Sequence, residues 1–323
     1  MALLDNSTYN PKYFFRSKHF NTMYRTLFHN FTIPFKRKRL ELNDKDFIDL
    51  DFSSVTSNKI AIVLHGLEGS SNSNYVKSLT QVLNDNKWDV VAVNFRGCSG
   101  ESNRLLSSYH SGKTDDLSRV IEYLEEQYNY ESFNIIGFSL GGNVTLKYLG
   151  QNEDTFSKKI MAAVTVSVPC DLKGSSESIA KFWNKVYMQR FLISLKKKSH
   201  IKLKQFPDSF LKKENIDNVK NFYDFDNMYT APAHGFKDAF DYWEKSSSKQ
   251  FINNIKVPTL LITATDDPFL SESCIPVKEA NNNKNFSLEI TKHGGHVGFN
   301  SNFSQSNGLW LENRIVQFLE DHE

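Results

Sequence analysis

The chain has 323 residues, 39% of them hydrophobic and 24% charged, which suits one large α/β domain better than a string of small modules. A formal net charge of +2 is too small to indicate a nucleic-acid-binding surface. The three cysteines, Cys98, Cys170 and Cys274, include no Cys-x-x-Cys pair, so the sequence indicates neither a disulfide framework nor a zinc site.

Residues 1–35 are rich in aromatic side chains, and we expect them to form an irregular N-terminal segment. The opening stretch, "MALLDNSTYN", lacks the basic flank and the apolar run of a signal peptide. No run in the chain approaches the roughly 18 apolar residues of a membrane span. We therefore expect a cytoplasmic protein.

After this segment, predicted strands alternate with predicted helices. Residues 38–52, "KRLELNDKDFIDLDF", alternate apolar and polar side chains around a turn, which predicts a β-hairpin. Six apolar or β-branched runs predict buried strands at residues 59–66, 88–97, 133–139, 160–169, 257–267 and 286–296. Helical spacing is found between strands, at residues 73–86, 114–128 and 142–151. The alternation predicts the α/β class, with a mostly parallel central sheet flanked by helices.

The strand at 59–66 leads into His65-Gly66-Leu67, and the loop brings the backbone N–H of Leu67 toward the expected site. We expect the His65 ring to hydrogen-bond to this loop and not to transfer protons, because a better base occurs later in the chain. In the loop after the next strand, "NFRGCSGE", we expect Arg96 and Glu101 to fix the loop by ion pairing and Cys98 to be a small packed residue.

The strand at 133–139 ends in a Gly-x-Ser-x-Gly pattern centred on Ser139. Gly137 and Gly141 remove the Cβ atoms that would keep the strand and the next helix apart, so the turn can lift the serine hydroxyl clear of the sheet. The helix that follows directs unsatisfied N–H groups, including that of Leu140, toward charge developing on a carbonyl oxygen. Leu140 and Leu67 are therefore the candidate oxyanion hole.

Residues 171–236 interrupt the alternation, because they separate two predicted strands by far more than a crossover helix needs. We interpret them as an inserted helical cap on a core of residues 36–170 and 237–323. Seven lysines occur between Lys196 and Lys213, against one acid, and they form either a solvated helix face or a contact with an anionic membrane or lipid headgroup. In the second interpretation, the side chains that face an acyl-binding cleft are Trp183, Tyr187, Phe191 and Leu195.

A serine nucleophile needs a base and a carboxylate that orients it, and both follow later strands in the order Ser, Asp, His. The strand at 257–267 ends in Asp266-Asp267-Pro268, and the strand at 286–296 ends in His293-Gly-Gly-His296. We favour Asp267, which the turn directs inward, and keep Asp266 as the alternative. We favour His296, because the two glycines allow its loop to reach Ser139, over His293, which lies nearer the strand end.

Other glycine and histidine patterns do not lead to a cofactor or a metal. Gly137 and Gly142 have the spacing of a P-loop but are followed by Asn143 and Val144, which lack its lysine and hydroxyl groups. The chain has no Gly-x-Gly-x-x-Gly after a strand and no His-Glu-x-x-His pair. We expect no cofactor and no metal.

With these motifs, "HGLEGSSNSNYV", "NFRGCSGESNR", "YHSGKTDDL", "GFSLGGNVTLKYLG", "DDPF" and "HGGHVGF", the chain resembles the YheT-like family of α/β-hydrolase-fold esterases, which is related to eukaryotic α/β-hydrolase-domain lipases. The resemblance extends from about residue 36 to the carboxyl terminus. It implies that Ser139, Asp267 and His296 form a charge-relay triad and that the reaction is hydrolysis of a carboxylic ester. It leaves the substrate open.

The sequence thus predicts a carboxylic ester hydrolase of esterase or lipase type, acting through an acyl-enzyme on a small ester or an acyl lipid. The same triad also serves thioesterases and amidases. Two alternatives are not enzymes: a ligand-binding sensor on the hydrolase fold, and an interaction scaffold that uses the lysine-rich cap.

Overall fold

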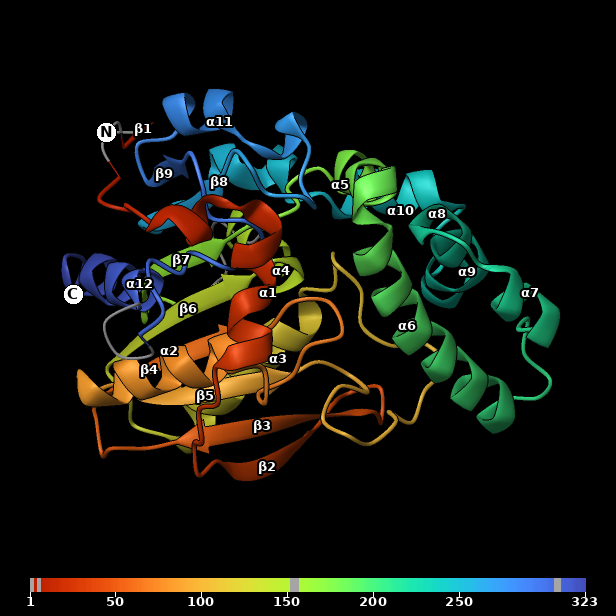
Figure 1. The fold of residues 1–323 in the computed structure, drawn as a ribbon. Helices are drawn as coiled ribbons and strands as arrows, with labels where there is room; N and C mark the ends of the chain where they lie inside the picture. The colour runs from red at the N-terminus through yellow and green to blue at the C-terminus, as the bar shows by residue number, and fades with distance from the viewer. Residues whose placement is uncertain (1–2, 5–6, 152–156, 305–308) are drawn as a thin grey trace.

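The computed structural model describes residues 3–4, 7–151, 157–304 and 309–323, and its strands form one sheet (Figure 1). The strands are β1 (Leu3–Leu4), β2 (Lys36–Glu41), β3 (Phe47–Ser53), β4 (Lys59–Leu64), β5 (Asp89–Asn94), β6 (Ser132–Phe138), β7 (Ile160–Val166), β8 (Thr259–Ala264) and β9 (Phe286–Thr291). Their order across the sheet is β1-β9-β8-β7-β6-β4-β5-β3-β2. The β2/β3 hairpin pairs antiparallel, as does β3 with β5, and all other pairs are parallel. The predicted fold class is confirmed.

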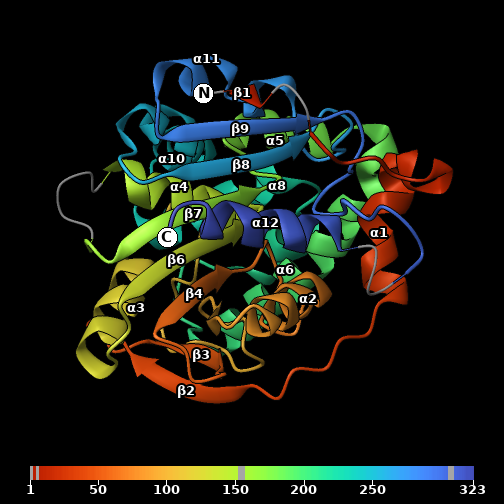
Figure 2. The same ribbon diagram turned by 90° about the vertical axis from the view of Figure 1, so that its left-hand side faces the viewer.

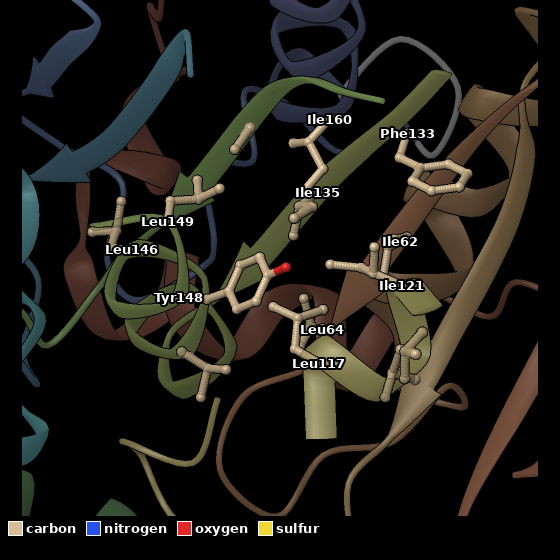
Figure 3. Packing of buried hydrophobic residues seen from close by; sticks show 14 of the residues in the cluster. Ile62, Leu64, Leu117, Ile121, Phe133, Ile135, Leu146, Tyr148, Leu149 and Ile160 are labelled. Carbon is tan, nitrogen blue, oxygen red and sulfur yellow. The ribbon is translucent and has the colours of Figure 1, made fainter. Parts of the chain in front are cut away.

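Apolar side chains cover both faces of the sheet because the parallel strands alternate them between two clusters. Along β4, Ile62 and Leu64 belong to one cluster, whereas Ala61 and Val63 belong to the other. The first cluster is closed by α3 (Asp115–Gln127) and α4 (Leu140–Gln151), and Figure 3 shows Leu117 and Leu149 packed there. The second is closed by α2 (Asn74–Asp85) and α12 (Trp310–Glu320), which lie on the opposite face (Figure 2). A short helix, α11 (Val277–Asn282), precedes β9.

The N-terminal segment differs from the irregular one we expected. A 3₁₀ turn (Tyr13–Arg16) leads into α1 (Lys18–Phe28). Contacts distant in the sequence hold this helix, since the buried Arg25 guanidinium pairs with Glu312 of α12 and donates to Ser78 of α2. The helical spacing of Phe20, Met23, Tyr24, Leu27 and Phe28 is present in the sequence, so the expectation of an irregular segment overlooked a local signal.

Helices fill the long connection between β7 and β8 (Figure 1). They are α5 (Leu172–Ile179), α6 (Lys185–Gln205), α7 (Lys213–Asn218), α8 (Phe222–Phe225), α9 (Ala231–His234) and α10 (Ala239–Ser246). Leu192 and Leu195 of α6 pack with Ile179, Phe225 and the core residue Phe269 in a small apolar cluster. The division into a cap at 171–236 and a core at 36–170 and 237–323 remains a prediction. No helix in the described ranges is long and apolar enough to cross a membrane.

Candidate active site

Ser139 occupies the single residue between β6, which ends at Phe138, and α4, which begins at Leu140. Its φ of 51° lies in the left-handed region, which is strained for a residue other than glycine. The flanking glycines permit this turn: a Cβ on Gly137 would lie 2.6 Å from the Gly141 carbonyl oxygen, and one on Gly141 would lie 2.7 Å from the His65 carbonyl oxygen. Ser139 therefore sits in a sharp turn at the carboxyl end of β6, which is the turn that the Gly-x-Ser-x-Gly pattern predicts.

The favoured acid and base lie next to the serine in one hydrogen-bonded chain. The Ser139 Oγ atom is 2.9 Å from His296 Nε2, and His296 Nδ1 is 2.8 Å from Asp267 Oδ2. Asp267 is almost fully buried, and its Oδ1 also accepts the N–H of Phe269 at 2.8 Å. A carboxylate at Nδ1 keeps the imidazole proton on that side, which leaves Nε2 free to accept the serine proton.

The two alternative residues, Asp266 and His293, pair with each other at a distance of 3.5 Å between Asp266 Oδ2 and His293 Nδ1. Asp266 Oδ1 accepts the N–H of Gly295 at 2.9 Å, and burial raises the pKa of this carboxyl. In the described part of the chain, neither side chain hydrogen-bonds to Ser139 or His296. Their contacts brace the loop that carries His296.

Residues that the sequence did not indicate hold that loop from two sides. Thr22 of α1 accepts the N–H of His296 at 2.9 Å, and Ser167, just after β7, accepts the N–H of Val297 at 3.0 Å. The Phe269 ring stacks on the His296 imidazole with centroids 4.1 Å apart. Gly295, with φ of 58°, lies so close to α1 that an added Cβ would be 2.5 Å from the Lys18 carbonyl oxygen. The helix we did not expect therefore positions the candidate base.

Leu67 and Leu140, the candidate oxyanion hole, line the same cavity as Ser139 and His296. Leu140 is the first residue of α4, so helix geometry leaves its N–H without a partner in the helix. The role of these two N–H groups remains a prediction.

His65, at the start of the loop that carries Leu67, is buried. Its Nδ1 donates to the Gly66 carbonyl at 2.7 Å while Nε2 accepts the N–H of Phe95 at 3.2 Å. Burial lowers the pKa of His65 to about 4, so the ring stays neutral near pH 7. The ring bonds to the loop, as we expected.

Glu68 follows Leu67 and joins the loop to the cap. Its φ is 55°, and its side chain is only 6% exposed. The carboxylate accepts from Tyr109 Oη at 2.7 Å, from Lys198 Nζ of α6 at 2.7 Å and from the Ser194 hydroxyl of α6. The backbone N–H of Glu68 donates back to Tyr109 Oη at 2.9 Å. The cap helix is thus bonded to the residue next to the candidate oxyanion hole.

The loop after β5 has the ion pairs that its sequence predicted. Arg96 is buried and pairs with Asp116 at 2.7 Å and with Asp44 at 2.6 Å, and Glu101 pairs with Arg39 at 2.7 Å. Cys98 is buried, and burial raises the pKa of its thiol to about 11. These contacts fix the wall of the cavity below the cap.

A cavity of about 440 Å³ lies between core and cap and opens onto Ser139 and His296. Of the four cap side chains that we expected to face a cleft, Phe191 and Leu195 line it. Trp183 is an error of prediction, since it is 79% exposed, and Tyr187 hydrogen-bonds instead to His19 of α1 at 3.1 Å. Trp183 lies in a 3₁₀ turn (Phe182–Asn184) before α6 begins, so the helical spacing that we extended back to it does not apply.

Two of the cap lysines point inward, which neither a solvated helix face nor a membrane contact predicts for them. Lys198 bonds to Glu68, and the buried Lys202 donates to the carbonyls of Asn103 and Leu105 at 2.5 and 2.6 Å. Burial lowers the pKa of Lys202 to about 8. No three His, Cys, Asp or Glu side chains gather as a metal site in the residues with described positions.

Comparisons with known proteins show the family and the fold to which the chain is similar. Residues 62–302 match the family model described as alpha/beta hydrolase fold. The chain is 36% identical to Escherichia coli YheT over 94% of this chain and 91% of that protein. It is 28% identical to Mus musculus phospholipase ABHD3 over 80% of this chain and 62% of that protein. Among solved structures, the Pyrococcus furiosus esterase Pf2001 shares the fold, with a TM-score of 0.62, 18% identity and coverage of 92% of this chain and 95% of that one.

Proposed function

Because this chain belongs to the α/β hydrolase fold family and shares its esterase- and lipase-type branch with YheT, we propose that it hydrolyses carboxylic esters with Ser139 as nucleophile. One observation carries the proposal: the unbroken hydrogen-bonded chain from Ser139 through His296 to the buried Asp267, at the floor of a cavity. Three groups in these roles are what an unactivated hydroxyl needs in order to attack a carbonyl.

The proposed mechanism has two halves. In the first, Ser139 Oγ attacks the ester carbonyl while His296 Nε2 takes its proton, and Asp267 holds the imidazolium that forms. His296 then gives the proton to the departing alcohol, which leaves an acyl-enzyme. In the second half, a water molecule attacks the acyl group while His296 takes its proton, and His296 then returns the proton to Ser139 Oγ as the bond to the acyl group breaks and the acid departs. The N–H groups of Leu67 and Leu140 stabilise the oxyanion in both halves.

Hydrolysis of p-nitrophenyl esters with a series of acyl chain lengths tests this function. We expect the wild type to cleave them and to be labelled by a fluorophosphonate, and we expect Ser139→Ala to lose about 10⁴-fold or more in kcat and all labelling. Ser70→Ala, a partly buried serine of the cavity wall, is the matched control and should retain both. A wild type that neither cleaves nor is labelled would contradict the proposal and favour a ligand-binding sensor.

A thioester or an amide is the alternative substrate, because the same three residues serve both. Comparison of esters, thioesters and amides with one acyl group would rank the leaving groups. The apolar lining of the cavity, including Leu172, Ile179, Phe191 and Leu195, supports an ester with an acyl chain, as does the relative named a phospholipase. An acyl lipid is therefore the substrate class that we propose.

We also propose a peripheral membrane contact, at a different part of the cap from the lysine cluster. In the 3₁₀ turn before α6 and in the first half of that helix, four apolar side chains are exposed by 68–79%: Phe182, Trp183, Val186 and Ile193. Lys181, Lys185 and Arg190 are exposed among them, and residues 178–207 contain no acid. Apolar side chains with basic residues beside them are suited to the interface of an anionic bilayer.

Sedimentation with vesicles tests the membrane contact. We expect the wild type to bind vesicles that contain phosphatidylglycerol, and the double variant Phe182→Ser/Trp183→Ser to lose about tenfold or more in affinity, because the two rings supply the insertion energy. Hydrolysis of a short soluble ester should be unchanged in this variant. Equal vesicle binding by both proteins would contradict the proposed surface.

A further inference from the structure

Asp226 is a carboxylate on the cap side of the cavity, and the proposed mechanism does not use it. It lines the same cavity as Ser139 and is only 9% exposed. Its two oxygens accept from neutral donors: Thr230 Oγ1 lies 2.6 Å from Oδ1, and Trp243 Nε1 lies 2.8 Å from Oδ2. These bonds occupy one lone pair on each oxygen and aim the carboxylate.

No ion pair neutralises Asp226 within the ranges that the structure describes. Four cationic side chains line the cavity, and none of them forms an ion pair with Asp226 in the described structure. Lys198 bonds to Glu68, Lys202 bonds to two backbone carbonyls, Arg96 pairs with Asp44 and Asp116, and Lys197 is exposed. Removing a carboxylate from water without a cation is costly, and burial accordingly raises the pKa of Asp226 to about 7. A neutral asparagine oxygen could accept these hydrogen bonds without the free-energy cost of burying a charge. A carboxylate at this position is therefore better suited to binding a cation that enters the cavity.

Several aromatic rings line the same cavity. Phe225, Tyr229, Tyr242 and Trp243 all line it, and the rings of Phe225 and Tyr229 lie 5.6 Å apart. The Ser111 N–H donates to Tyr242 Oη at 3.0 Å, which fixes that ring against the core. Ring faces attract cations through their quadrupole, and such groups of rings recognise quaternary ammonium ions.

The backbone at Asp226 is also unusual, because residues Asp226–Thr230 form a π-helical turn between α8 and α9. Such turns are rare and occur often at functional sites, since the wider turn re-aims a side chain. Thr230 is the last residue of this turn, and its hydroxyl donates to the carboxylate of Asp226, the first residue.

We propose that Asp226 and the adjacent rings of Phe225, Tyr229 and Trp243 form a subsite that binds an ammonium group of the substrate. The inference rests on the proposed function, and it narrows the substrate to an ester with a cationic amine some distance from the carbonyl carbon. The ammonium group lies against the carboxylate while Ser139, which lines the same cavity, attacks the ester.

Matched pairs of p-nitrophenyl esters test the subsite. In each pair the acyl chain ends either in a trimethylammonium group or in a tert-butyl group of the same shape without charge, over a series of chain lengths. At the length that spans the cavity, we expect the wild type to prefer the ammonium ester by about tenfold or more in kcat/KM. Asp226→Asn should remove this preference, so that the variant cleaves the two members of each pair with kcat/KM values within about twofold of each other.

Equal cleavage of both members of every pair by the wild type would overturn the proposal, and this comparison needs no variant to fold. A preference that survives Asp226→Asn would also overturn it. If the wild type cleaves no ester at all, the proposed function fails separately. Calorimetric binding of hexyltrimethylammonium to the wild type then tests the subsite alone, with binding that weakens in Asp226→Asn as the supporting result and no binding as the contrary one.

Discussion

Asparagine in place of Asp267 is expected to lower kcat for p-nitrophenyl ester hydrolysis by about 10⁴-fold. The carboxylate accepts the proton of His296 Nδ1, with the two atoms 2.8 Å apart. An amide that turns its NH₂ group toward Nδ1 favours the other imidazole tautomer, whose Nε2 carries the proton and cannot accept one from Ser139. Folding should survive, because asparagine has the same shape and its oxygen can still accept the N–H of Phe269.

Asp266→Asn is the matched control for this experiment. The two carboxyls are adjacent in the chain and both are mostly buried, but Asp266 bonds to Gly295 and His293 and not to His296. We expect this variant to lose less than about tenfold in kcat, through a loosened loop. A larger loss in Asp266→Asn than in Asp267→Asn would show that the orienting carboxylate is Asp266. Thermal unfolding of both variants separates a catalytic loss from a loss of structure.

The sequence was informative where a local pattern determines the structure. The six buried strands, the hairpin and the turn at Ser139 each follow from residues within a short window, such as the glycines beside Ser139. That Ser139, Asp267 and His296 meet after β6, β8 and β9 could be predicted for a different reason, because parallel strands bring their carboxyl ends to one edge of the sheet.

Contacts between distant segments could not be predicted in this way. Helix α1 depends on Arg25 reaching Glu312, and Thr22 supports the loop of His296 only after that helix has docked. The inward direction of Lys198 and Lys202 is set by Glu68 and by two backbone carbonyls across the cavity. A run of lysines in the sequence therefore shows that the cap helix is basic, but it does not show which of these lysines are buried.

The bond between Lys198 and Glu68 is expected to affect catalysis although neither residue belongs to the proposed triad. Glu68 holds a left-handed backbone conformation directly after Leu67, and the cap residues Lys198 and Ser194 bind its carboxylate. Loss of this support should let the Leu67 N–H move away from the oxyanion. Removal of one oxyanion donor costs about 10²–10³-fold in kcat, and we expect Glu68→Gln and Lys198→Met to lose about 10–100-fold because the donor is displaced and not deleted.

Steady-state kinetics distinguish this effect from a defect in substrate binding. An oxyanion donor acts mainly in the transition state, so kcat should fall while KM changes little, and a trifluoromethyl ketone that mimics the tetrahedral intermediate should bind more weakly by a similar factor. Lys204→Met is the matched control, because Lys204 is an exposed lysine of the same helix. An effect on KM alone in Lys198→Met would mean that the cap lysine only shapes the cavity. A fall in kcat in both Lys198→Met and Glu68→Gln, without one in Lys204→Met, would mean that docking of the cap completes the catalytic site.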